Sequence, residues 1–173
     1  GFLNGEFPAE VGGAGLSCYD HTLIIEELNY GCLGIATSAI ANSLAALPLM
    51  LADNPALRQE YLGRLTAKHG YAAYACSEPD AGSDVAGMST RFVKKGDKYV
   101  LNGRKRWITS ADVADWYTVF AKTSDDVTER NHDSISAFIV ERGWEGVEVG
   151  STDRKMGVRG VDIGSHLDEP RLL

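Results

Sequence analysis

The sequence predicts an α+β protein in which an N-terminal helical segment is followed by a small antiparallel β-barrel or sandwich domain. Up to about residue 69 the apolar residues recur at helical spacing, whereas from about residue 70 they alternate in short runs separated by turn residues. Helices followed by consecutive strands indicate an α+β arrangement and not a parallel α/β sheet. We therefore expect a helical part over residues 1–69 and a β-domain that begins at residue 70.

Composition excludes several classes of function. The chain has 173 residues and a net charge of −7, which argues against a general nucleic-acid binder or a protein of anionic membrane surfaces. Its three cysteines are odd in number and show no CxxC spacing, which favours free thiols in a reducing compartment. None of the four histidines has a metal-binding spacing, so we expect no metal site.

Three helices are expected in the first part, over residues 21–30, 33–51 and 55–66. The first has an apolar stripe on one side. The second is apolar nearly all round, which predicts an enclosed helix; its polar residues and Pro48 argue against a membrane span. Asn54 is a good cap for the third helix, and Pro55 occupies the favoured first helical position.

Seven strands are expected in the second part. Two of the connections between them carry hairpin signals, one at residues 95–98 and one at Asn102-Gly103. We interpret Arg104, Lys105 and Arg106 as a solvated strand face. The expected strands are residues 71–77, 90–95, 98–102, 104–108, 116–122, 135–141 and 147–149.

One stretch, Tyr74 to Gly87 (YACSEPDAGSDVAG), combines a strand with a turn of small, hydrogen-bonding residues. Such a turn is suited to bring backbone N–H groups against an anionic or polar ligand. Glu78 is a candidate base, but a carboxylate beside a turn proline more often braces the turn. Cys76 has no predicted cationic neighbour, so we expect an inert buried thiol there.

Together these stretches resemble the acyl-CoA dehydrogenase family, and most closely its medium-chain type. The resemblance runs from residue 1 to about residue 159 and rests mainly on SEPDAGSD, NGRKRWIT, EELNYG and KMGVR. It implies partial N-terminal and middle domains of a three-domain fold, with the C-terminal helical domain missing. It also implies FAD-dependent α,β-dehydrogenation of fatty acyl-CoA thioesters, as in fatty acid β-oxidation.

The resemblance assigns roles to individual residues. Cys76 and Ser77 would meet the pyrimidine edge of the flavin, Gly82 and Ser83 its pyrophosphate, and Thr109 would hydrogen-bond near N5. Ser83 and His132 would contact the substrate. The full set of cofactor-binding residues implied is Tyr74, Cys76, Ser77, Gly82, Ser83, Trp107, Ile108 and Thr109.

The resemblance fails after Arg159, so we expect a divergent tail over residues 160–173. The family's catalytic glutamate belongs to its last domain, and no residue here matches it, so we expect an incomplete chain without a catalytic base. Implied partners are fatty acyl-CoA, electron-transfer flavoprotein and further copies of the subunit, a tetramer in the complete enzyme. No nucleic acid and no membrane insertion are expected.

Alternatives remain within this interpretation. The chain could be an inactive truncated product that binds ligand or full-length subunits, or a related acyl-CoA oxidase or flavin monooxygenase. Its compartment would be the mitochondrial matrix in a eukaryote or the cytoplasm in a bacterium.

Overall fold

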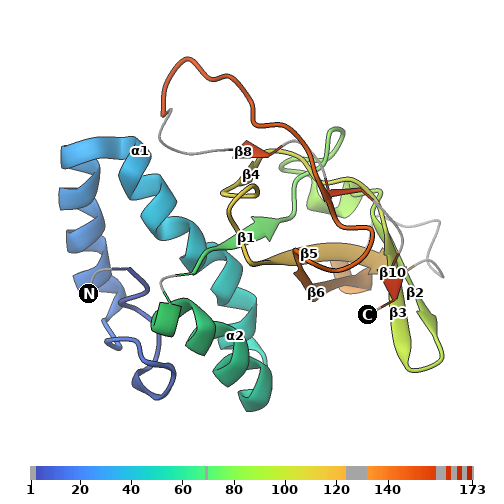
Figure 1. Ribbon diagram of the computed structural model, residues 1–173, viewed down its shortest axis with the longest axis horizontal. Helices are drawn as coiled ribbons and strands as arrows, with labels where there is room; N and C mark the ends of the chain where they lie inside the picture. Colours follow the sequence, from blue (N-terminus) through green and yellow to red (C-terminus); the bar gives the residue numbers. More distant parts are fainter. Residues whose placement is uncertain are drawn as a thin grey trace.

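The computed structural model describes residues 3–68, 70–123 and 132–158, together with the backbone of residues 163–164, 167–168 and 171–172. Its two long helices, α1 (Cys18–Leu51) and α2 (Pro55–Lys68), form one part of the molecule, and the strands form the other. Strand β1 (Ala72–Ala75) leaves the helical part and enters the sheet, where it lies between α1 and β5 (Trp116–Thr123) (Figure 1). The predicted order, helices first and strands second, is confirmed.

The two helices expected over residues 21–30 and 33–51 form the single element α1, which has a kink at Cys32. The backbone of Cys32 leaves the helical region of φ/ψ space, with φ −162° and ψ 107°. Gly31 and Gly34 lie on either side of this kink. Ser17 caps the first turn, because its Oγ accepts the N–H of Asp20 at 3.2 Å. The helix continues through Pro48 and ends at Leu51.

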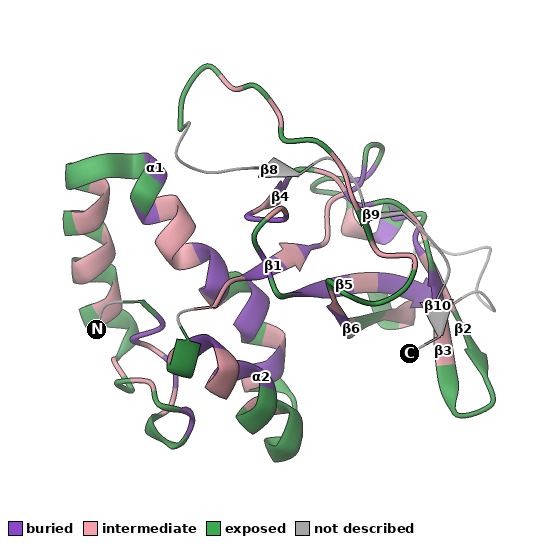
Figure 2. Ribbon diagram, viewed as in Figure 1, coloured by how far each residue is buried: buried purple, intermediate pink, exposed green. Residues whose placement is uncertain are grey.

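The prediction that residues 33–51 form an enclosed helix is correct on one side only. The buried side carries mostly small residues, including Ala41, Ala45 and Ala46, and packs against β1 and α2. The opposite side is exposed, as Figure 2 shows along the upper half of α1. Its exposed apolar residues include Leu33, Ile35, Leu44, Leu47 and Leu51.

By length and composition alone α1 could cross a membrane. Its contacts are those of a domain core, however. Asn42, fully buried on α1, donates from Nδ2 to the carbonyl of Gly70 at 3.1 Å. The hydroxyl of Thr118, on β5, donates to the carbonyl of Ala45 at 2.7 Å. We therefore describe α1 as the helix on which the β-domain is docked.

Helix α2 begins as predicted. The Oδ1 of Asn54 accepts the N–H of Leu57 at 3.1 Å, and Pro55 is the first helical residue. Its buried residues Tyr61, Leu62 and Leu65 share one core with the N-terminal segment, which includes the short 3-10 helix η1 (Ala9–Val11).

The main sheet has six strands in the order β1-β5-β2-β3-β10, and β6 also pairs with β5. It is mixed and open, whereas we expected an antiparallel barrel or sandwich. Both β1 and β2 run parallel to β5, and the other pairs are antiparallel. Parallel pairing of β1 with β5 is possible because the long intervening chain forms the crossover. The remaining members are β2 (Arg91–Lys95), β3 (Lys98–Asn102), β6 (Ile135–Glu141) and β10 (Arg171–Leu172).

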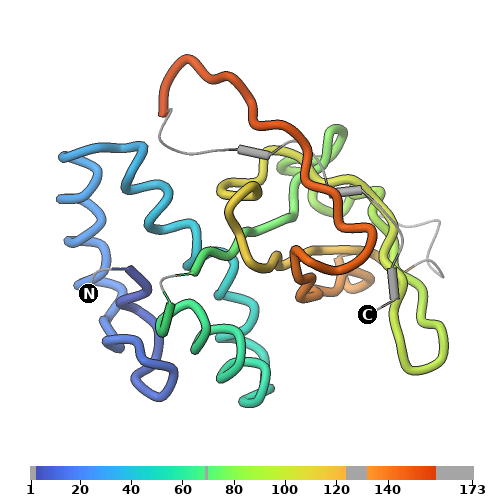
Figure 3. The backbone as a smooth tube through the Cα atoms, viewed as in Figure 1, coloured from blue at the N-terminus to red at the C-terminus, as the bar shows by residue number. Residues whose placement is uncertain are grey.

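Two short pairs of strands flank this sheet. Strand β4 (Ile108–Thr109) pairs with β8 (Ile163–Gly164), and β7 (Glu148–Val149) pairs with β9 (Leu167–Asp168). Strands β8, β9 and β10 thus pair with three separate strands, β4, β7 and β3. Figure 3 traces the described backbone from the helical part into the β-domain. These three short strands lie within residues 160–173, where we expected a divergent tail.

The hairpin predicted at residues 95–98 is confirmed, since Lys95 and Lys98 are register partners around a two-residue turn with Gly96 at φ +62°. The hairpin predicted at Asn102-Gly103 is wrong. A methyl group on Gly103 would lie 2.6 Å from the Cα of Thr90, so this glycine permits a close backbone approach and makes no turn. The strand predicted over 104–108 is reduced to Ile108–Thr109.

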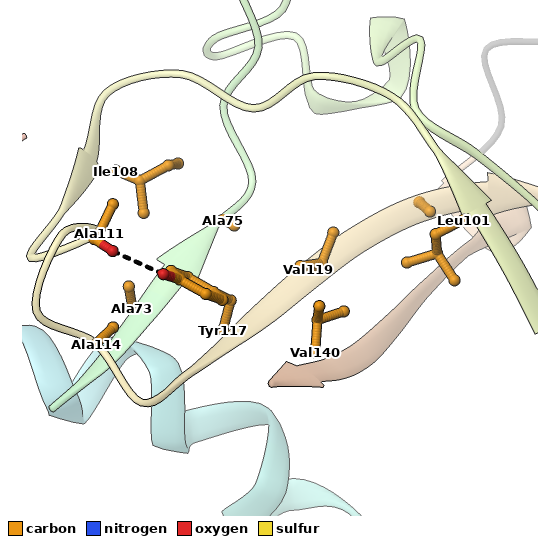
Figure 4. Close-up of a cluster of buried hydrophobic side chains, with 10 residues drawn as sticks. Ala73, Ala75, Leu101, Ile108, Ala111, Ala114, Tyr117, Val119 and Val140 are labelled. Carbon is orange, nitrogen blue, oxygen red and sulfur yellow. Dashed lines mark hydrogen bonds between the residues drawn. The ribbon is translucent and has the colours of Figure 1, made fainter. Parts of the chain in front are cut away.

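Alternation along β5 divides the core in two. Trp116, fully buried, faces the helices and meets Tyr61 edge to face, with 5.5 Å between ring centroids. The next residue, Tyr117, faces the other way, into a cluster with Val119 and Val140 (Figure 4). Its hydroxyl donates to the carbonyl of Ala111 at 2.7 Å. Burial raises the pKa of Tyr117 to about 12, so it remains a neutral donor.

Candidate functional site

A cavity of about 180 Å³ lies where α1, the end of β1 and β4 meet. Its wall is largely apolar, with two aromatic rings and a few hydroxyl groups, the combination that suits a planar organic ligand with polar edges. The lining residues are Thr37, Ile40, Ala41, Leu44, Tyr74, Ser77, Trp107, Ile108 and Thr109.

The β1 side of the cavity is formed by Tyr74 and Ser77. The ring of Tyr74 packs against Phe120, with centroids 5.0 Å apart, and burial raises the pKa of its hydroxyl. The Ser77 hydroxyl makes no hydrogen bond to any group in the described part of the chain. Its backbone N–H is likewise without an acceptor there. Ser77 therefore offers two donors to a ligand in the cavity.

A second part of the wall is formed by Trp107, Ile108 and Thr109. Trp107 has φ +58°, a left-handed conformation that is strained for a bulky residue, and half of its side chain is exposed. The guanidinium of Arg106 lies over its ring, 5.4 Å from the centroid. Within the described residues the Thr109 hydroxyl has no hydrogen-bond partner. The wall thus combines an indole plane with an available hydroxyl.

The turn after β1 is closed by two backbone hydrogen bonds between Glu78 and Ala81, of 2.8 and 3.3 Å. Gly82 and Ser83 follow it and are exposed. Neither of their backbone N–H groups donates to another described residue. A methyl group on Gly82 would meet nothing within 4 Å, so this space is open to a ligand. Two adjacent free N–H groups beside an open space suit an anion such as a phosphate.

Beneath the turn lies a buried ion pair between Glu78 and Lys105. The Nζ of Lys105 is 2.8 Å from Oε1 of Glu78, and each side chain is only 1% exposed. The same Nζ donates to the carbonyl of Cys76 at 3.0 Å. Ser89 and Thr90 each donate to the Glu78 carboxylate with both the backbone N–H and the hydroxyl. The carboxylate is therefore fully hydrogen-bonded, as a buried charge must be.

These bonds decide the charge of both groups. Burial by itself would raise the pKa of Glu78, but the donors from Lys105, Ser89 and Thr90 outweigh it and lower that pKa to about 2. Burial lowers the pKa of Lys105, and the attraction of Glu78 opposes this. Glu78 is thus ionised, buried and hydrogen-bonded to Lys105, Ser89 and Thr90. It braces the turn and does not serve as a base, which is the interpretation that the sequence favoured.

The prediction for Lys105 is wrong, because its side chain is buried. We expected Arg104 to Arg106 to form a solvated strand face, yet Lys105 is buried while Arg104 is exposed. The partner charge on Glu78 is remote in sequence, which is why the run of cations gave no sign of it. Cys76 is only partly buried and has a cationic neighbour after all, because Lys105 lies beside it. Burial raises the pKa of its thiol and outweighs the opposing effect of Lys105, so the expected neutral thiol is retained.

The structure brings five predicted cofactor residues to one cavity: Tyr74, Ser77, Trp107, Ile108 and Thr109. The other predicted residues lie outside its lining. Cys76 precedes Ser77 and is tied to Lys105, and Gly82 and Ser83 lie on the adjoining turn. His132 is exposed in the 3-10 helix η3 (His132–Ser134), just before β6, and is not among the lining residues. Its substrate role stays a prediction. Missed by the sequence were Thr37, Ile40, Ala41 and Leu44 of α1.

Comparison with known families gives two matches that together span most of the chain. Residues 1–69 match the acyl-CoA dehydrogenase N-terminal domain, and residues 73–167 match the acyl-CoA dehydrogenase middle domain. The chain is 38% identical over 162 residues to the probable medium-chain specific acyl-CoA dehydrogenase 2, mitochondrial, of Caenorhabditis briggsae, covering 94% of this chain and 40% of that protein. It is 41% identical over 168 residues to the cyclohex-1-ene-1-carbonyl-CoA dehydrogenase of Geobacter metallireducens, covering 96% of this chain and 43% of that protein.

Solved structures of acyl-CoA dehydrogenases share the fold of this chain. The acyl-CoA dehydrogenase of Bacillus anthracis, complexed with FAD, superposes with a TM-score of 0.88 at 34% identity over all of this chain and 29% of that one. The butyryl-CoA dehydrogenase of Megasphaera elsdenii gives 0.88 at 30% identity, over all of this chain and 46% of that one. The chain spans less than half the length of these relatives. From the sequence matches and the shared fold we conclude that this chain belongs to the acyl-CoA dehydrogenase family.

Proposed function

We propose that the chain supplies the FAD-binding wall of an enzyme that dehydrogenates fatty acyl-CoA thioesters between Cα and Cβ. The observation that carries the proposal is the cavity between Tyr74, Ser77, Trp107 and Thr109, whose two available hydroxyl groups lie beside aromatic walls. Family membership supports the reaction class, and the FAD complex of the Bacillus anthracis relative supports the cofactor.

The residues present fit a flavin. Trp107 and Tyr74 offer faces for a planar ring, while the N–H and hydroxyl of Ser77 are neutral donors for its polar edge. The open turn at Gly82 and Ser83 suits a pyrophosphate. Bound there, FAD would supply the hydride acceptor. Fixed neutral donors stabilise negative charge that develops on such an acceptor without requiring a nearby cation.

The cavity contains no proton acceptor among the described residues: its lining includes no carboxylate and no histidine. Because the α-proton of a thioester is weakly acidic, its removal needs a general base. The proposal for this chain by itself is therefore binding without turnover. This same observation favours the second candidate function, a catalytically inactive product that binds flavin or pairs with full-length subunits.

Partners follow from the same proposal. Fatty acyl-CoA would be the substrate and electron-transfer flavoprotein the electron acceptor, with association of subunits as in a family tetramer. The relatives include mitochondrial and bacterial proteins, which correspond to the two proposed compartments, the mitochondrial matrix and the bacterial cytoplasm.

Flavin retention tests the proposal. The 173-residue chain is mixed with excess FAD and desalted, and its flavin absorbance is recorded. We expect retained flavin in the wild type, less in Thr109→Val, and unchanged retention in Thr22→Val, whose hydroxyl lies on α1 and donates to Cys18. Absence of flavin from a folded wild-type chain would refute cofactor binding. Reduction of a dye by octanoyl-CoA in the pure chain would refute the proposed lack of turnover.

A further inference from the structure

The ion pair of Glu78 and Lys105 connects the two segments that form these walls of the cavity, and each segment contributes one residue to the pair. Glu78 follows Ser77 directly, and Lys105 precedes Trp107 by two residues. Both side chains are 1% exposed, so neither can contact a ligand in the cavity. The proposed function assigns them no task. The Glu78 carboxylate nevertheless accepts five hydrogen bonds, from Lys105, Ser89 and Thr90.

Lys105 fixes the orientation of one peptide group. Its Nζ donates to the carbonyl of Cys76 at 3.0 Å, which holds that carbonyl toward the core. In a trans peptide the carbonyl of one residue and the N–H of the next point in opposite directions, and none of the described peptide bonds is cis. The N–H of Ser77 is therefore directed away from Lys105. That N–H has no acceptor among the described residues.

The neighbouring residue joins the walls directly. The backbone N–H of Arg106 donates to the carbonyl of Ser77 at 2.8 Å, so the segment that leads into Trp107 is attached to the end of β1. Lys105 anchors the same segment to Glu78 from below. Lys105 and Arg106 thus bind the adjacent residues Glu78 and Ser77, so neither wall can shift without breaking one of these hydrogen bonds.

We propose that the Glu78–Lys105 pair is a positioning device that joins the two walls and aims the Ser77 N–H at the flavin edge where negative charge develops. The proposal rests on the proposed function, because it assigns the pair a task toward FAD. A purely structural pair would stabilise the fold and leave the affinity and the midpoint potential of bound flavin unchanged.

The test compares three forms of the 173-residue chain: wild type, the double variant Glu78→Gln/Lys105→Met, and Lys122→Met. The double variant removes both charges and the donor to Cys76, and avoids the uncompensated buried charge of a single substitution. Lys122 is the matched control, a lysine 3% exposed whose Nζ donates to the carbonyl of Ala86 at 3.1 Å. Urea unfolding identifies the loss of stability that each substitution causes.

The first readout needs no flavin. Hydrogen exchange of the Arg106 amide reports the bond between the walls, and we expect it to rise about tenfold in the double variant relative to Lys122→Met. The second readout is flavin itself. We expect the FAD dissociation constant to rise about tenfold in the double variant, with a lower midpoint potential, since a directed donor to the reduced ring is lost.

The outcomes separate the two proposals. Unchanged Arg106 exchange in the double variant would overturn the joining of the walls. Faster exchange with wild-type FAD affinity and potential would overturn the task toward the flavin and make the pair structural. A folded wild-type chain that binds no FAD would refute the proposed function, while the exchange of Arg106 still decides whether the pair joins the walls.

Discussion

The backbone N–H of Ala72, the first residue of β1, donates to Oδ1 of Asn42 on α1 at 2.8 Å. The amide Nδ2 of the same Asn42 donates to the carbonyl of Gly70 at 3.1 Å and to Oδ1 of Asn4 at 3.0 Å. One fully buried side chain thus satisfies the backbone where the helical part passes into the sheet. It fixes where β1 starts relative to α1, and both elements line the candidate site.

We expect Asn42→Leu to destabilise the chain by about 3 kcal/mol or more, because it leaves the Ala72 N–H and the Gly70 carbonyl buried without partners. Urea unfolding monitored by circular dichroism measures this difference. The control is Asn29→Leu, because the Asn29 side chain donates within its own helix, to the carbonyl of Ile25, and to no other described residue. Equal losses in the two variants would contradict the anchoring role of Asn42.

Stability should fall in acid through Glu78. Its folded-state pKa, about 2, lies below the ordinary value of 4.5, so it stabilises the fold fully above about pH 4.5. That contribution, on the order of 3 kcal/mol, is lost as the pH falls from about 4.5 toward 2. Urea unfolding at a series of pH values tests this. We expect a shallower acid loss in Glu78→Gln, and an identical pH profile in the two proteins would be evidence against it.

Two glycines should respond differently to alanine. At Gly103 the new methyl group would lie 2.6 Å from the Cα of Thr90, and we expect a loss of about 1–3 kcal/mol in unfolding free energy. At Gly82 nothing lies within 4 Å, and φ is not positive, so stability should change by less than about 0.5 kcal/mol. Under the proposed function Gly82→Ala should instead weaken FAD binding. A destabilised Gly82→Ala chain would contradict this division.

The contact of α2 with β6 should contribute little. Nη1 of Arg64 lies 2.8 Å from Oε1 of Glu141, which also accepts the Tyr61 hydroxyl at 3.2 Å. The hydrogen bond from Arg64 lowers the pKa of Glu141, although burial opposes it. Because the pair is about one-third exposed, a double-mutant cycle of Arg64→Met and Glu141→Gln should give a coupling below about 1 kcal/mol, reduced by added salt. A larger, salt-independent coupling would contradict this.

Local sequence signals predicted much of the fold correctly. The cap at Asn54, the turn around Gly96 and strand 135–141 are where the sequence places them, because propensity and periodicity act over a few residues. The parallel pairing of β1 with β5 could not be predicted, because it joins residues 72–75 to residues 116–119 and no local sequence pattern indicates it. Asn102-Gly103 misled because its glycine accommodates Thr90, a neighbour that only tertiary structure provides.

The site divides in the same way. Tyr74, Ser77 and Trp107 could be named from two short motifs, and they line one cavity. The helical wall, including Ile40 and Leu44, could not be named, because apolar helix residues that face a ligand resemble those that face a core. Lys105 was misassigned because burial depends on a partner charge far away in the sequence.

The route of β1 has a consequence for the order of folding. Both helices and β1 are complete in the chain long before Trp116–Thr123 appears, yet among the described strands β1 pairs only with β5. Closing so long a loop is slow and entropically unfavourable, so the helical part should fold first and the ligand-facing end of β1 last. On a ribosome, a nascent chain that stops before β5 would carry two packed helices, while the candidate cavity at the end of β1 would not yet have formed.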